Sequence, residues 1–175
     1  MRIPTQLSVA FKALLLAAAV MCCATPAAAQ SPAGPSTISF VHEGVINAAI
    51  ADVWTIWSTA DGYKRLGPQL VDFDLRVGGF IRAKYQNTGT LGDVDTIVNR
   101  ILAFEPERMM AMRIDRTPAG FPFTEAWKHT WTVITLTPVN ATQTHVRIAS
   151  LGFGSDPESV KMRQFFAAGN AATLK

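Results

Sequence analysis

From residue 38 onward, hydrophobic positions first recur at the period of a strand and then at the period of a helix. Residues 38–47 alternate between two faces, which predicts a β-strand. Asn47 is placed to cap a helix behind it. The apolar positions of this helix have helical spacing: Ile50, Val53, Trp54 and Trp57. Residues 59–62 (TADG) interrupt the pattern, so a short second helix is expected at 63–66.

Residues 70–151 contain short runs with strand periodicity, separated by turn-forming residues. Gly78-Gly79 is a hairpin signal, and the Pro-rich segment 117–124 (TPAGFPFT) is expected to be a loop that exposes Phe121 and Phe123. A further turn is expected at 138–141. The predicted strands are 70–77, 80–86, 93–104, 108–115, 125–137 and 142–151. With the first strand they make seven antiparallel strands.

The last segment returns to helical spacing and continues nearly to residue 175. Ser155 or Asp156 can cap this helix, Pro157 suits its first turn, and Glu158 favours the positive end of the helix dipole. Its apolar positions are Met162, Phe165, Phe166, Gly169 and Ala172. The pattern therefore predicts an α+β fold, with a single domain at residues 38–175.

The first 29 residues have the organisation of a secretory signal peptide. They begin with basic residues, continue with an apolar run at 13–21, and end in an A-x-A cleavage site at 27–29. The apolar run is shorter than the roughly 20 residues that span a bilayer. We expect cleavage before Gln30, a flexible leader at 30–37, no membrane span in the mature chain, and export to the periplasm or beyond the cell.

Cleavage changes what the composition implies. Cys22 and Cys23 lie inside the expected signal peptide, so no cysteine nucleophile, thiolate metal site or disulfide is expected in the mature chain. Neither cysteine follows the residues typical of a lipoprotein site. Removing Arg2 and Lys12 leaves fourteen Lys and Arg residues against thirteen Asp and Glu, a net charge of +1. A nucleic-acid partner is therefore not indicated.

Several short motifs resemble the SRPBCC (START-like) superfamily. The similarity is closest to its heat-shock ATPase activator homologue branch, which overlaps with proteins called polyketide cyclase or dehydrase. The motifs are Val53-Trp54, 74–79 (DLRVGG), 105–108 (EPER), 132–138 (TVITLTP) and Gly152-Phe153. One departure is Gly169-Asn170, which stands where members of this branch commonly carry Gly-Trp, and it is expected to alter the floor of a pocket.

The resemblance implies a helix-grip fold, in which a seven-stranded curved antiparallel sheet wraps around a long C-terminal helix. Two short helices follow the first strand, and an apolar cavity lies between the sheet and the last helix. The residues expected to bind a ligand are Ile81, Tyr85, Met110, Met112, Phe121, Phe123, Met162 and Phe166. The alternative for the strand residues is that they fill the core. For Phe121 and Phe123 the open choices are a lid and a partner surface.

The register of the 125–137 strand decides which of its residues face inward. If Ile134 points inward as the family pattern implies, then Leu136, Thr132, Thr130 and Lys128 share its face. The residues expected outside, unless a bulge intervenes, are Trp127, His129 and Trp131.

No group of acid–base residues has the spacing of a known catalytic motif. The weak candidates are His129 with Glu125, which would share a strand face, and Tyr85. His42, His129 and His145 lack metal-ligand spacing, so neither a metal site nor a cofactor is expected.

The first hypothesis is an exported protein that binds a hydrophobic small molecule or lipid without catalysis. The alternative is a cyclase or dehydrase acting on a polyketide-like substrate in the same cavity. A third, a co-chaperone of a heat-shock ATPase, conflicts with export.

Overall fold

The computed structural model describes residues 38–173 of the chain. The expected signal peptide (1–29) and leader (30–37) lie outside the described residues, as do the last two positions of the expected domain.

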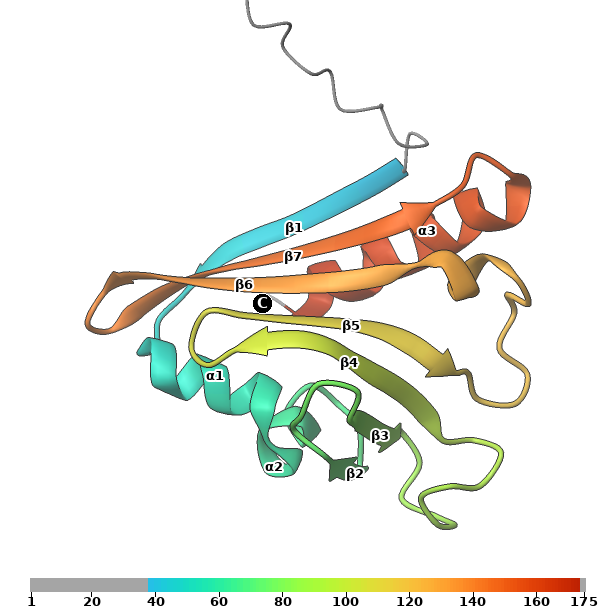
Figure 1. Cartoon of the computed structure of the whole chain (residues 1–175), viewed down its shortest axis with the longest axis horizontal. Helices are drawn as coiled ribbons and strands as arrows, with labels where there is room; N and C mark the ends of the chain where they lie inside the picture. Colours follow the sequence, from blue (N-terminus) through green and yellow to red (C-terminus); the bar gives the residue numbers. More distant parts are fainter. Residues whose placement is uncertain (1–37, 174–175) are drawn as a thin grey trace, which may run out of the picture. The chain divides into compact units, whose positions relative to one another are not determined.

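Seven antiparallel strands form one sheet in the order β1-β7-β6-β5-β4-β3-β2 (Figure 1). From β2 to β7, each strand pairs with the next strand in the chain, which makes a meander. The last strand, β7, also pairs with β1, which is an edge strand of the sheet. The strands are β1 (Ile38–Ile46), β2 (Leu70–Phe73), β3 (Phe80–Lys84), β4 (Ile97–Glu105), β5 (Met109–Arg116), β6 (Trp131–Asn140) and β7 (Gln143–Phe153). The predicted seven-stranded curved antiparallel sheet is confirmed.

The helices cover one face of this sheet from its two ends. They are α1 (Ile50–Ser58), α2 (Ala60–Lys64), the 3-10 helix η1 (Ala126–His129) and α3 (Pro157–Thr173). α1 contacts β6 and β7, α2 contacts β2, and α3 contacts β1, β7 and η1. In Figure 1, α3 runs alongside β1 and β7, while α1 and α2 lie toward the β2 end. The helix-grip arrangement predicted from the family resemblance is confirmed.

The helix starts differ from the prediction. Asn47 does not cap α1; the N-cap is Ala49, whose side chain makes no capping bond, and Asn47 instead accepts a hydrogen bond from Gln143 Nε2 (2.8 Å). The second helix begins earlier than predicted, because Thr59 Oγ1 accepts a hydrogen bond from the backbone N–H of Gly62 (3.0 Å) and caps α2. The Asp156 cap of α3 is confirmed: its Oδ1 accepts from Ser159 N (2.9 Å).

Gly62 lets α1 and α2 meet, and replacing it by alanine is expected to destabilise the fold by about 1–3 kcal/mol. An added Cβ would overlap the backbone oxygen of Thr55 and lie 2.7 Å from Ile56 Cα. The control is Gly44→Ala in β1, where a Cβ meets nothing within 4 Å. Thermal unfolding followed by circular dichroism should show a lower Tm for Gly62→Ala alone. Equal melting of the two variants would contradict this account.

Two predicted strands were too long because local hydrogen bonds favour loops. β2 ends at Phe73 rather than residue 77, since Arg76 N donates to Asp74 O (3.0 Å) and starts the turn. β4 begins at Ile97 rather than residue 93, because the side chain of Asp93 accepts hydrogen bonds from nearby groups in the loop 87–96.

The predicted 125–137 strand and 138–141 turn were also wrong at their boundaries. Residues 126–129 form η1 instead of a strand, and β6 then continues through Pro138 to Asn140. Proline is tolerated there because β5 pairs with β6 only at residues 132–135, so Pro138 lies where no N–H is needed on that side.

The core has two clusters of buried side chains. The larger one joins α1 to the inner face of the sheet, with Trp54 stacked on Phe104 at a ring-centroid distance of 6.5 Å. Trp54 therefore packs the first helix against the sheet. The smaller cluster joins the loop before η1 to α3 and contains Phe123, Ala126, Phe153 and Met162.

Candidate functional site

A cavity of about 1040 Å³ lies between the sheet and α3. Aromatic and aliphatic side chains form most of its wall. They include Trp57, Leu66, Ile97, Met112, Ile114, Trp131, Ile134, Ile148, Phe153, Phe165 and Phe166. None of the described lining residues is Asp, Glu, His or Lys, so the wall offers no carboxylate, imidazole or amine.

The register of β6 agrees with the inward face expected from Ile134. Thr130, Thr132 and Ile134 all line the cavity, and Leu136 is buried in the core. The expectation for Lys128 was wrong, because this residue lies in η1 and is exposed. The expectation that Trp131 lies outside was wrong, because Trp131 also lines the cavity. It is the first residue of β6, opposite Leu151 of β7, and its ring lies against Gly152.

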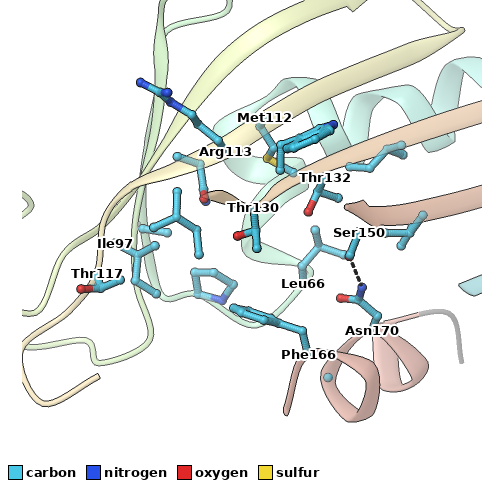
Figure 2. A pocket seen from close by; sticks show the side chains of 18 of the residues that line it. Leu66, Ile97, Met112, Arg113, Thr117, Thr130, Thr132, Ser150, Phe166 and Asn170 are labelled. Carbon is cyan, nitrogen blue, oxygen red and sulfur yellow. Dashed lines mark hydrogen bonds between the residues drawn. The ribbon is translucent and has the colours of Figure 1, made fainter. Parts of the chain in front are cut away.

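Four polar side chains converge on the part of the cavity formed by β6, β7 and α3. We call Thr130, Thr132, Ser150 and Asn170 the β6–β7 polar cluster (Figure 2). Thr132 is directly opposite Ser150 in the β6–β7 register. Asn170 Nδ2 donates to Ser150 Oγ (3.3 Å), and Thr130 Oγ1 donates to Trp127 O (2.9 Å). The expected effect of Gly169-Asn170 on the pocket floor has a structural counterpart, since both residues line the cavity.

A second polar group lies on the α2, β3 and β4 side of the cavity. It consists of Tyr63, Tyr85 and Asn99. Burial raises the pKa of Tyr63 above its ordinary value, with a further contribution from Tyr85, whereas the Asn99 side-chain hydrogen bond lowers it. Burial also raises the pKa of Tyr85. Both phenols are therefore protonated at neutral pH, where they donate hydrogen bonds and do not act as bases.

The loop of Phe121 and Phe123 is tied to α3. Phe121 packs against Phe165 and Phe166, with ring centroids 6.2 and 6.4 Å away. The Glu158 carboxylate accepts hydrogen bonds from the backbone N–H groups of Thr124 and Glu125, which lower the pKa of Glu158. Phe121 thus lines the cavity from a loop that is anchored to the first turn of α3.

The structure divides the predicted ligand-binding residues into two sets. Tyr85, Met112, Phe121 and Phe166 line the cavity. The other four do not line it and are buried in the core clusters: Ile81, Met110, Phe123 and Met162. Alternation along a strand places residues on the inner face but does not show how far the helices cover them, so core and cavity positions look alike in sequence.

The suggested acid–base pair lies outside the cavity. Both residues are exposed; Glu125 is the N-cap of η1 and His129 is its last residue, so they do not share a strand face. Glu125 accepts a hydrogen bond from Lys128 Nζ (2.6 Å), and neither Glu125 nor His129 lines the cavity. Of the three catalytic candidates only Tyr85 lines it, and its side chain is 60% exposed.

Sequence reasoning missed several lining residues. Trp57, named above only as an apolar position of the first helix, lines the cavity and meets Tyr63 edge to face at 6.5 Å. Asn99 and Ser150 were not singled out. Asn99 lies two residues after Ile97, and Ser150 lies two residues after Ile148, so each shares the inward face of its strand with an apolar lining residue. A polar residue in such an alternating pattern could have indicated both positions.

Within residues 38–173, no group of three or more His, Cys, Asp or Glu side chains is placed to hold a metal ion. In the same range, no helix has the length and apolar character needed to cross a membrane.

Solved structures share this fold at low sequence identity. The Aha1 dimer from Colwellia psychrerythraea matches with a TM-score of 0.57 and 17% identity, over 78% of this chain and 93% of that one. Protein MLL2253 from Mesorhizobium loti matches with a TM-score of 0.58 and 18% identity, over 78% and 93%. Norcoclaurine synthase from Thalictrum flavum matches with a TM-score of 0.52 and 15% identity, over 79% and 91%. At these identities the likeness shows the fold alone.

The family assignment comes from the sequence of the domain as a whole. No curated protein matches this chain significantly. The family model described as polyketide cyclase / dehydrase and lipid transport matches residues 37–174, which include every described strand and helix. The fold and this match agree, and the chain belongs to the polyketide cyclase/dehydrase and lipid transport family of the SRPBCC superfamily.

Proposed function

We propose that this chain is an exported protein that binds a hydrophobic small molecule or lipid in the cavity between the sheet and α3. The observation that carries the proposal is the cavity itself, about 1040 Å³ in volume with a mainly apolar wall. Ligand pockets in proteins usually have this character, with a few polar groups that fix orientation. Burying roughly 300 Å² of apolar ligand surface would contribute about 7 kcal/mol before the entropic costs of association.

Native mass spectrometry of the protein purified from its host tests this proposal. We expect a small molecule to copurify, and an apolar fluorescent probe such as trans-stilbene to bind the ligand-free protein and to be displaced by the extracted molecule. Recovery of the processed chain from the exported fraction would support the export part. A ligand-free protein that binds no apolar probe would contradict the binding function, and an unprocessed chain in the cytoplasm would contradict export.

A second candidate is an enzyme of the cyclase or dehydrase type. The observation that favours it is the pair of protonated phenols, Tyr63 and Tyr85, in the cavity wall, because each can donate a hydrogen bond that stabilises negative charge on a substrate carbonyl oxygen. A poly-β-ketone offered as substrate distinguishes the two functions. Turnover that falls in Tyr85→Phe and persists in His129→Ala would support the enzyme, and unchanged substrate would support the binding protein.

A further inference from the structure

Apart from Thr117 and the two arginines, Arg65 and Arg113, the polar side chains that line the cavity are gathered at two places. The β6–β7 polar cluster lies at one side, with Thr132 and Ser150 on adjacent strands, and Asn99 with Tyr63 lies at the other. Between them the wall is formed by Met112 and Ile114 of β5 and by Phe166 of α3. A ligand that spans the cavity therefore meets hydrogen-bonding groups at both ends and apolar groups in the middle.

The sheet register sets the spacing of the two polar places. Thr132 is opposite Met112, and Asn99 is opposite Ile114, so Thr132 and Asn99 are two strands apart with an offset of two residues. Two strand spacings of about 4.8 Å and an offset of about 7 Å put their Cα atoms roughly 12 Å apart. That is the length of an elongated molecule of a few fused or linked rings.

The β6–β7 polar cluster has hydrogen-bonding capacity left over. Among the described residues, Thr132 makes no side-chain hydrogen bond, and Ser150 and Asn170 make only the bond they share. Ser150 is buried and Thr132 is half-buried. Two hydroxyl groups and an amide oxygen can together serve a hydroxyl group or a carbonyl oxygen, since they supply both donors and an acceptor.

The charges of the wall argue against an ionic ligand group inside the cavity. The charged lining residues are Arg65 and Arg113, and both are exposed. Arg113 lies 3.7 Å from Asp115, and its guanidinium points away from Thr130 and Thr132 in Figure 2. A carboxylate or ammonium at the β6–β7 polar cluster would be buried without an opposite charge, which is strongly unfavourable.

We propose that the ligand is an elongated, uncharged molecule with a hydroxyl or carbonyl oxygen at each end of a rigid apolar frame. One oxygen binds at Thr132, Ser150 and Asn170, and the other binds at Asn99 and Tyr63. This inference rests on the proposed binding function and narrows its ligand class. It applies whether the molecule is carried unchanged or converted.

A series of stilbenes with the same frame tests the inference. The probes are trans-stilbene, 4-hydroxystilbene, 4,4′-dihydroxystilbene and 4,4′-stilbenedicarboxylate, titrated by their own fluorescence. We expect each hydroxyl group that hydrogen-bonds to the polar side chains at its end of the cavity to tighten binding about ten-fold relative to stilbene, so the dihydroxy compound should bind tightest. We expect the dicarboxylate to bind more weakly than the dihydroxy compound.

Variants locate the two ends. Thr132→Val with Ser150→Ala should reduce the advantage of dihydroxystilbene over stilbene about ten-fold, and Asn99→Leu should do the same at the other end. The matched control is Thr137→Val, which makes the same change at an exposed position of β6 and should leave the ratio unchanged. Thermal melts establish that each variant is folded.

The possible outcomes distinguish a failure of the proposed ligand class from a failure of the proposed binding function. Stilbene binding with no gain from the hydroxyl groups, or tightest binding of the dicarboxylate, would overturn the ligand class while the apolar binding function stands. Failure of all four probes to bind would overturn both.

Discussion

Replacing Gly169 by leucine is expected to weaken binding of an apolar probe about ten-fold or more while leaving the protein at least as stable. Gly169 lines the cavity from α3, and a Cβ added there meets nothing within 4 Å. The Cβ of a new side chain would thus enter open space, and we expect the rest of a leucine to occupy part of the cavity that the ligand needs. Glycine inside a helix costs up to about 1 kcal/mol relative to a good helix former, so the substitution favours α3.

The matched control is Gln164→Leu, which introduces the same side chain at an exposed position of α3 that does not line the cavity. Stilbene titration and thermal unfolding should show weaker binding only in Gly169→Leu and no loss of Tm in that variant. Parental affinity in Gly169→Leu would mean that the ligand does not occupy this part of the cavity. A large fall in Tm would mean that the position is not open.

Local patterns were sufficient to predict most of the strands and helices because each element carries its own periodicity, whereas their helix-grip arrangement was predicted from the family resemblance. Alternation in residues 38–47 and helical spacing after residue 157 needed no knowledge of distant contacts. The predicted ends of elements were wrong where a side chain that is charged or distant in sequence hydrogen-bonds to the backbone and stabilises another local structure. η1 replaces the start of a predicted strand where Glu158, more than thirty residues later, binds the N–H groups of Thr124 and Glu125. Nothing near residue 125 signals that contact.

The site was harder to predict than the fold because the cavity is assembled from many elements. Tyr63, Asn99, Ser150 and Asn170 come from α2, β4, β7 and α3, and each looks unremarkable in its own segment. The inward face could be predicted from alternation, as Met112 shows. The boundary between core and cavity depends on how the helices cover that face: Met110 and Met112 both belong to the larger core cluster, but only Met112 also lines the cavity.

A buried ion pair organises the loop between β3 and β4. The Lys84 side chain is only 2% exposed, and its Nζ donates to the Asp93 carboxylate. That carboxylate also accepts from the backbone N–H groups of Thr90 and Asp95 and from Thr96 Oγ1. The hydrogen bond from Lys84 is the largest of the effects that lower the pKa of Asp93. Asp93 therefore both neutralises a buried ammonium and closes the loop.

Asp93→Asn is accordingly expected to lower Tm by on the order of 10 °C, because it leaves the buried Lys84 ammonium without an opposite charge. Lys84→Met should cost less, since the remaining carboxylate keeps its other hydrogen bonds and is partly exposed. The double variant should melt above Asp93→Asn alone, because it removes both charges and keeps a similar volume. Melting of all three variants at the parental temperature would contradict the role given to this pair.

The same pair predicts how the difference between parent and Asp93→Asn depends on pH. The folded protein holds the pKa of Asp93 below its ordinary value of 3.8, so the ionised carboxylate contributes stability that is fully present above about pH 4. This contribution is lost as the pH falls through the unfolded and then the folded pKa. The Tm gap should therefore be constant near neutral pH and narrow below pH 4. A gap that widened on acidification would mean that the protonated form of Asp93 is the one the fold prefers.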